Sequence, residues 1–220
     1  DMLREAAMDA TVERIQITAY RLASSSRIIH ALINAARNGK SVVVMLELKA
    51  RFDEEANLEW KSVLEEEGIR VLLGVPNMKV HAKLCVITRR EKQKLQYYGF
   101  VSTGNLNESS ARVYADHCLL TSSPAIMRDA MRVFEYLEKW QRGMMPLRKC
   151  KALLVSPVSM RSGIARMIEQ EIKAARTGKK AKIIIKLNSL SDPALIKLLN
   201  KAASSGVELH LIVRGIYCAQ

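Results

Sequence analysis

The sequence predicts an α/β protein built from mixed, largely parallel sheets. Short apolar segments rich in β-branched residues alternate along the chain with amphipathic segments of helical periodicity. Residues 41–48 are apolar at nearly every position, which is typical of a strand buried on both faces of a parallel sheet. A weak internal repeat is a third observation, because residues 33–40 resemble residues 172–179 and similar elements follow both copies. These observations predict two related α/β halves.

The helices are predicted from capping residues at their starts and glycines near their ends. The serines at 24–26, Asp53 and Asp192 are N-cap candidates, and Pro124 fits the first turn of a helix. The predicted helices are residues 3–12, 27–37, 54–67, 124–140, 160–175 and 193–204.

The strands are predicted from apolar runs or alternating patterns between these helices. The predicted strands are residues 14–22, 41–48, 69–73, 76–87, 97–103, 115–121, 152–155, 181–187 and 207–213. Residues 143–151 break the pattern with Pro146 and a basic run, so the domain boundary is predicted there. The first domain is assigned to residues 1–147 and the second to residues 148–220.

The charge balance indicates a polyanionic partner. The 220 residues include 35 Lys and Arg against 22 Asp and Glu, a formal net charge of +13. Aromatic residues make up only 5%, which disfavours a single-strand nucleic-acid binder that works by base stacking. No apolar run is long enough to span a membrane, although the positive charge leaves peripheral association with a membrane open.

The cysteines and the first residues of the chain indicate the cellular compartment of the protein. Cys85, Cys118, Cys150 and Cys218 show no Cys-x-x-Cys spacing, and the first two fall within apolar strand patterns. We therefore expect reduced, buried thiols. The first residues are charged and amphipathic, unlike a signal peptide, so a cytoplasmic protein is predicted.

Residues 76–87 contain the most informative chemistry. If they form a strand, His81 and Lys83 share one face and the apolar residues share the other. An imidazole can attack phosphorus while a neighbouring ammonium stabilises the charge that builds on the phosphoryl oxygens. Gly104 and Asn105, which end the next strand, would add an amide donor and room for a close backbone approach.

His-x-Lys followed by Gly-Asn resembles the signature of the phospholipase D superfamily, although the acidic residue of that signature is replaced here by Thr88. The longer sequence motifs resemble those of one branch of this superfamily, polyphosphate kinase, over residues 20–215. The segments that carry this resemblance are residues 47–57, 79–84, 102–105, 111–116, 186–192 and 211–215.

The resemblance implies two phospholipase D-like halves and reversible transfer of the γ-phosphoryl group of ATP to inorganic polyphosphate through phospho-His81. It implies that Lys83 and Arg214 neutralise phosphates and that Tyr114 contacts the nucleotide. The repeat would place a counterpart of His81 at or beyond residue 219, where no histidine occurs. We therefore expect the second half to be truncated in this chain, the isolated chain to be nearly inactive, and the full-length enzyme to be a homo-oligomer.

The resemblance also implies Mg²⁺ binding at Arg21 and Arg51. A guanidinium has no lone pair to offer a metal, so we interpret both arginines as phosphate contacts beside Mg²⁺ carried by ATP. The other histidines, His30, His117 and His210, are expected to be structural, with His117 and His210 in strands.

Two alternatives to the kinase stay open. A phospholipase D-like phosphodiesterase would share the covalent histidine and pass the intermediate to water. A non-catalytic polyanion-binding module would use the net charge of +13 alone. The expected partners are ATP or ADP and polyphosphate, and no nucleic acid.

Overall fold

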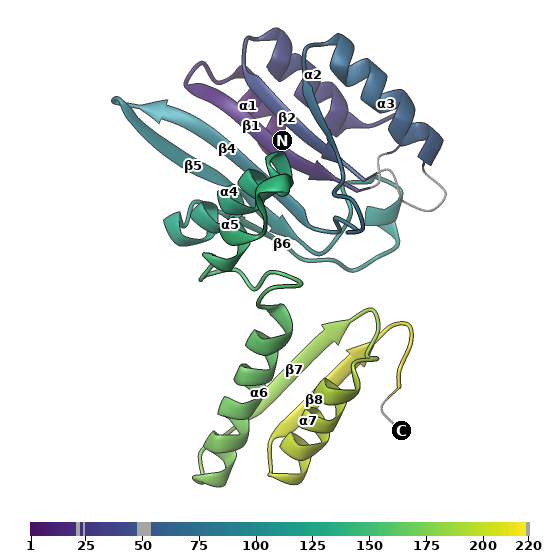
Figure 1. Cartoon of the computed structure of the whole chain (residues 1–220), viewed down its shortest axis with the longest axis vertical. Helices are drawn as coiled ribbons and strands as arrows, with labels where there is room; N and C mark the ends of the chain where they lie inside the picture. Colours follow the sequence, from purple (N-terminus) through teal and green to yellow (C-terminus); the bar gives the residue numbers. More distant parts are fainter. Residues whose placement is uncertain (21–22, 24, 48–53, 219–220) are drawn as a thin grey trace. The chain divides into compact units, whose positions relative to one another are not determined.

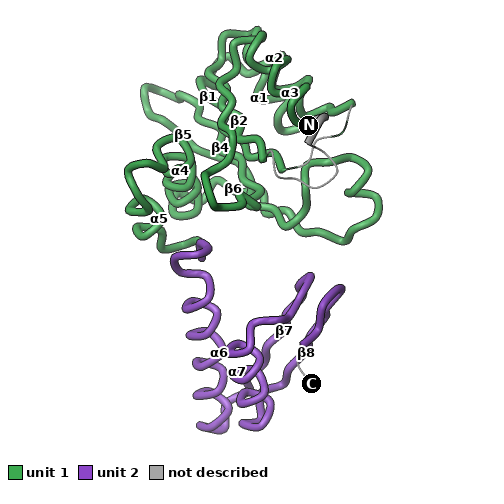
Figure 2. Tube along the Cα trace, turned by 45° about the vertical axis from the view of Figure 1, so that its right-hand side comes forward, with its two compact units in different colours: residues 1–153 green, residues 154–220 purple. Residues whose placement is uncertain are grey.

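The structure is a computed structural model that describes residues 1–20, 23, 25–47 and 54–218. The chain divides into two compact units, residues 1–153 and 154–220 (Figure 2). The domain boundary predicted from the sequence lies between residues 147 and 148.

The described residues of unit 1 form six strands in one mixed sheet. The strands are β1 (Val12–Ala19), β2 (Ser41–Leu46), β3 (Arg70–Leu73), β4 (Lys83–Glu91), β5 (Lys94–Ser102) and β6 (Cys118–Thr121). Their order is β3-β2-β1-β4-β5-β6. The three strands β1, β2 and β3 run parallel to one another, whereas β4, β5 and β6 join by antiparallel pairing. The predicted mixed α/β architecture is therefore confirmed.

Helices cover both faces of this sheet (Figure 1). The helical elements of unit 1 are α1 (Met2–Met8), α2 (Arg27–Arg37), α3 (Glu54–Glu66), η1 (Ser110–Arg112), α4 (Pro124–Glu138), η2 (Trp140–Arg142) and α5 (Met145–Arg148). Ile15 and Ile17 of β1 join the core with residues of α1, α2 and α3. The next residue over, Gln16, faces away and donates to Glu138 of α4 at 2.8 Å. Side-chain alternation along β1 thus separates the two helical layers.

Two predicted features of α2 and β2 are confirmed. The Ser26 side chain accepts a hydrogen bond from the Ile29 backbone N–H and caps α2. Gly39 follows the helix with φ of +78°, a left-handed conformation that favours glycine. All residues of β2 after Ser41 are buried, as expected for a strand between two parallel neighbours.

In the described part of unit 2, residues 154–218, two parallel strands and two helices are present. They are α6 (Met160–Arg176), β7 (Lys182–Leu187), α7 (Pro193–Ser204) and β8 (Glu208–Val213). The Asp192 side chain accepts from the backbone N–H groups of Ala194 and Leu195, so it caps α7 as predicted.

The helix predicted over residues 3–12 ends at Met8, and Val12 begins β1 instead. Three strand predictions were also wrong. Residues 152–155 form bends and coil, because the backbone N–H groups of residues 151–153 donate to the Asp129 side chain instead of a neighbouring strand. Residues 76–82 and 115–117 also lie outside the strands, for reasons given below. The hairpin between β4 and β5 was missed, since Lys92 and Gln93 make its turn with positive φ and without glycine.

Candidate active site

One edge of the sheet in unit 1 gathers three residues of the predicted site, His81, Lys83 and Asn105. Lys83 at the start of β4 pairs with Ser102 at the end of β5, and Ser102 pairs with Cys118 at the start of β6. The parallel strands β1 and β2 end at the same edge, because Ile17 near the end of β1 pairs with Cys85. His81, the Gly104-Asn105 pair and Asp116 leave adjacent strands here. Open α/β sheets commonly bind ligands beyond the carboxyl ends of parallel strands.

His81 and Lys83 lie side by side, as predicted. Lys83 Nζ is 3.0 Å from His81 Nδ1 and donates to the His81 carbonyl oxygen at 2.8 Å. An ammonium only donates, so Nδ1 acts as the acceptor in this arrangement and the neutral ring carries its proton on Nε2. Lys83 is 4% exposed, whereas His81 is exposed. The imidazole therefore faces the surface with a buried cation behind it.

The strand that was predicted to carry both residues starts only at Lys83. The reason is Thr18, whose Oγ1 donates to the Ala82 carbonyl at 2.7 Å and accepts from Leu84 N–H at 2.9 Å. The Thr18 hydroxyl takes the place of a backbone hydrogen-bond partner for Ala82 and Leu84. The chain before this point turns at Asn77, whose φ is 58°. The expectation of one buried and one open strand face was also wrong, because β4 is buried on both faces from Lys83 to Ile87.

The Gly104-Asn105 pair lies against Asp116. A Cβ added at Gly104 would be only 2.6 Å from Asp116 Oδ2, so this close approach requires glycine. Thr103 Oγ1 donates to Asp116 Oδ1 at 2.9 Å and fixes the carboxylate. Asn105 Oδ1 is buried and has no hydrogen-bond partner within the described part of the chain. This oxygen is therefore available to a donor or a cation supplied by a ligand.

The Tyr114 region differs from the prediction. Tyr114 follows η1 in a loop, its backbone N–H donates to Ser110, and the residue is 47% exposed. Strand β6 begins only at Cys118, so Asp116 and His117 precede the strand that was predicted over residues 115–121. The expectation of buried thiols was wrong for three cysteines: Cys118 and Cys218 are exposed, and Cys150 is half-buried. Cys118 is exposed because β6 is the last strand of the sheet. Cys85 is buried as expected, and burial raises the pKa of its thiol.

Arg214 lies in unit 2, just after β8. Its Nε and Nη2 donate to Asn188 Oδ1 at 3.0 and 2.8 Å. A Cβ at Gly215 would be 2.8 Å from the Asn188 carbonyl oxygen, so glycine permits this close packing. His210 is exposed rather than buried and contacts Glu208 at 2.7 Å, because it lies on the open face of β8.

Arg21 and Arg51 lie outside the described residues, so their predicted phosphate contacts stay predictions. Within the described ranges, no group of three His, Cys, Asp or Glu side chains could hold a metal ion. Mg²⁺ is commonly bound by one or two protein oxygens together with substrate phosphates. Asp116 and the unpartnered Asn105 Oδ1 fit that smaller role.

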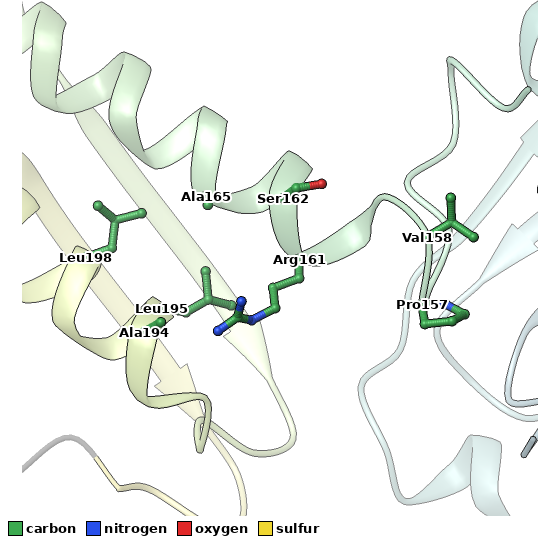
Figure 3. A pocket seen from close by; sticks show the side chains of 8 residues that line it. All are labelled: Pro157, Val158, Arg161, Ser162, Ala165, Ala194, Leu195 and Leu198. Carbon is green, nitrogen blue, oxygen red and sulfur yellow. The ribbon is translucent and has the colours of Figure 1, made fainter. Parts of the chain in front are cut away.

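A separate hollow of about 340 Å³ lies in unit 2 between the first turns of α6 and α7. Figure 3 shows the Arg161 side chain extending toward Ala194 and Leu195. That guanidinium pairs with Asp192 at 2.6 Å, and the other lining residues are small or apolar, apart from Ser162. The hollow contains none of the predicted site residues.

The sequence prediction missed Tyr20 and Glu47, which follow β1 and β2 at the sheet edge of unit 1 that carries His81. The signals were weak: Tyr20 directly follows the last residue of β1, and Glu47 is an acidic residue directly after the buried run of β2. No helix of the described chain is long and apolar enough to cross a membrane.

Comparison with known proteins gives consistent matches to one family. Residues 1–143 match the family model for polyphosphate kinase C-terminal domain 1, and residues 153–220 match the model for domain 2. Polyphosphate kinase of Vibrio vulnificus is 44% identical over 98% of this chain, and that of Escherichia coli K12 is 43% identical over 98%. The chain spans only 30% and 31% of these two relatives.

A solved structure gives the same result. The crystal structure of polyphosphate kinase from Porphyromonas gingivalis aligns with 100% of this chain and 36% of its own, at 40% identity and a TM-score of 0.86. A phospholipase D family member, Nuc from Salmonella typhimurium, aligns with 64% of this chain at 15% identity and a TM-score of 0.48. From the family models and the close relatives, the chain belongs to the polyphosphate kinase family.

Proposed function

We propose that the full-length protein carrying this chain transfers the γ-phosphoryl group of ATP to inorganic polyphosphate, with His81 as the nucleophile. The observation that carries the proposal is the contact between Lys83 Nζ and His81 Nδ1 at 3.0 Å, at the open edge of the sheet, in a member of the polyphosphate kinase family. A nucleophile and a fixed cation within hydrogen-bond distance are what phosphoryl transfer needs.

In the first step, the lone pair of an imidazole nitrogen attacks the γ-phosphorus. A P–N bond forms, the bond from the γ-phosphorus to the bridging oxygen breaks, and ADP leaves with the electron pair. The ring keeps its own proton on the other nitrogen. In the second step, a terminal oxygen of polyphosphate attacks the phosphorus, and the P–N bond breaks to restore the neutral imidazole. The reverse sequence makes ATP.

Lys83 would neutralise charge on the transferred group, since its ammonium already lies at the ring. An incoming phosphate is a stronger acceptor than a neutral imidazole, so it would draw this ammonium away from Nδ1. Asn105 and Asp116 would hold Mg²⁺, which would accompany ATP and neutralise its phosphates. Tyr114 would contact the nucleotide, and Arg214, Arg21 and Arg51 would contact phosphates.

The test is labelling of the full-length protein with γ-³²P-ATP and Mg²⁺. We expect an acid-labile, base-stable label that is absent in His81→Ala. The matched control is His30→Ala, because His30 is an exposed histidine on α2 of the same unit. Equal label in His81→Ala and the control would assign the nucleophile to another residue.

A phosphodiesterase is the second candidate, because Asp116 and Lys83 lie at the same sheet edge and hydrolysis would use the same histidine. It predicts release of product from a simple phosphodiester in the absence of ATP. Label transfer from the phosphoenzyme to polyphosphate, with no such hydrolysis, would exclude it.

A further inference from the structure

We propose that Tyr20 is a positioning residue of the phosphoryl-transfer site, whose ring orients His81 and holds two lysine ammoniums beside it. This inference rests on the proposed function of His81. It adds a residue that touches neither ATP nor polyphosphate in the proposed reaction.

The Tyr20 ring lies against His81 and two lysine ammoniums. Its centroid lies 4.6 Å from that of His81, at an interplanar angle of 77°. Lys83 Nζ lies 5.0 Å from the Tyr20 centroid, and Lys79 Nζ lies 5.3 Å from it. Edge-to-face packing fixes an imidazole plane, and an aromatic ring attracts ammonium groups at these distances. Within the described residues, one side chain therefore contacts the proposed nucleophile and two lysine ammoniums.

The two ammoniums repel each other when no substrate is present. The negative face of an aromatic ring offsets part of this repulsion without forming an ion pair. A carboxylate in the same place would compete with phosphate for the lysines, whereas a ring releases them readily. Tyr20 can thus hold the ammoniums of Lys79 and Lys83 at the ring that packs on His81.

Buried hydrogen bonds hold the backbone around this ring. Asn57 Nδ2 donates to the carbonyl oxygens of Tyr20 at 3.3 Å and Glu47 at 3.0 Å, which ties the ends of β1 and β2 together. Glu47 Oε2 accepts from the Val80 backbone N–H at 2.7 Å, next to His81. Asn57 is 0% exposed and Glu47 is 2% exposed. One hydrogen-bond network therefore holds the backbone at Tyr20 and the Val80 backbone next to His81.

Tyr136 shows what a structural tyrosine in this fold looks like. It is 5% exposed, close to the 6% of Tyr20, and its hydroxyl contacts Met78 Sδ at 3.8 Å. Among the described ring contacts, Tyr136 has no cation or histidine partner. Burial alone therefore does not explain the groups around Tyr20.

The kinetic test uses the full-length protein and three variants. Tyr20→Phe keeps the ring, Tyr20→Leu removes it, and Tyr98→Leu is the matched control, since Tyr98 packs near Arg89 at 5.9 Å on the same sheet. At saturating ATP we expect phosphoenzyme formation to slow about tenfold or more in Tyr20→Leu, and to stay within about threefold in the other two. Equal slowing in Tyr20→Phe and Tyr20→Leu, or no slowing in Tyr20→Leu, would overturn the proposal.

The second measurement needs no activity. In the 220-residue chain, the imidazole resonances of His81 can be assigned by comparison with His81→Ala. We expect these resonances to move in Tyr20→Leu and to change little in Tyr20→Phe and Tyr98→Leu, because only the first variant removes the neighbouring ring. Unchanged resonances in Tyr20→Leu would refute the contact. If the wild type forms no phosphoenzyme but the resonances move as expected, the proposed function fails while the orientation of His81 by Tyr20 stands.

Discussion

Asp129 of α4 is the buried carboxylate whose removal should weaken unit 1 most clearly. Its Oδ2 accepts from the backbone N–H groups of Lys151, Ala152 and Leu153 at 2.7, 2.6 and 3.0 Å. Its Oδ1 accepts from Arg132 Nη1 at 2.7 Å, and the residue is 2% exposed. The carboxylate thus fixes the last residues of unit 1 against α4.

Asp129→Asn keeps the shape and removes the charge. The amide oxygen can replace one carboxylate oxygen, but the NH₂ group must then face either Arg132 or the three backbone donors. Hydrogen bonds to a charged group contribute about 1.5–3 kcal/mol each, and a buried pair that loses one partner costs about 3–5 kcal/mol. The four bonds are not additive, so we expect the free energy of unfolding of unit 1 to fall by about 3 kcal/mol.

The assay is urea unfolding of the 220-residue chain followed by tryptophan fluorescence. Both tryptophans, Trp60 and Trp140, belong to unit 1, so the signal reports this unit alone. Asp192→Asn is the matched control, because it removes a capping carboxylate in unit 2 and should leave the fluorescence transition unchanged. A loss below about 0.5 kcal/mol in Asp129→Asn, typical of a neutral surface substitution, would refute the reasoning.

The effect should also depend on pH. Burial pushes the pKa of Asp129 up, but hydrogen bonds from the backbone of Leu153, Ala152 and Lys151 and from Arg132 outweigh burial and hold the pKa below its usual value. A lowered folded-state pKa means that the carboxylate stabilises the fold above the unfolded pKa of about 3.9. The advantage of the wild type over Asp129→Asn should therefore shrink as pH falls through the folded-state pKa.

Three further predictions follow from single contacts. Gly104→Ala should slow phosphoenzyme formation about tenfold or more, measured by γ-³²P-ATP labelling, because the new Cβ would meet Asp116 Oδ2 at 2.6 Å; an unchanged rate would show that this close approach is not needed. Lys40→Met should lower the free energy of unfolding by about 2 kcal/mol in the same fluorescence assay, because the buried ammonium donates to two backbone carbonyls; a stable variant would contradict it. Nitrogen-15 shifts of neutral His81 should show the proton on Nε2 without substrate, and Lys83→Met should reduce this preference; a proton on Nδ1 in the wild type would refute the contact.

The sequence predicted the helices and the parallel strands well because their signals are local. Arg27–Arg37 has a cap, an amphipathic period and a terminal glycine within one segment, and its predicted bounds are those of α2. The Asp192 cap and the segments around β7 and β8 were also predicted correctly. The neighbouring residues His81 and Lys83 needed only short-range spacing, so their proximity could be predicted as well.

Tertiary contacts decided what the pattern could not. The hydroxyl of Thr18 takes the place of a backbone partner, so β4 begins only at Lys83, although Thr18 lies far away in the sequence. The Asp129 side chain accepts hydrogen bonds from backbone N–H groups that strand pairing would need. Both effects come from side chains that outcompete backbone pairing, and no local periodicity reveals them.

The same division applies to the candidate site. Motif spacing in the sequence indicated the family and singled out His81 and Lys83 as candidates. Only the folded sheet brought Tyr20, from the end of β1, within 4.6 Å of the His81 ring, and brought Glu47, from the end of β2, to the Val80 backbone. The physical reason is that the ends of parallel strands and the start of an antiparallel strand meet at one sheet edge, whereas the residues they carry are separated along the chain.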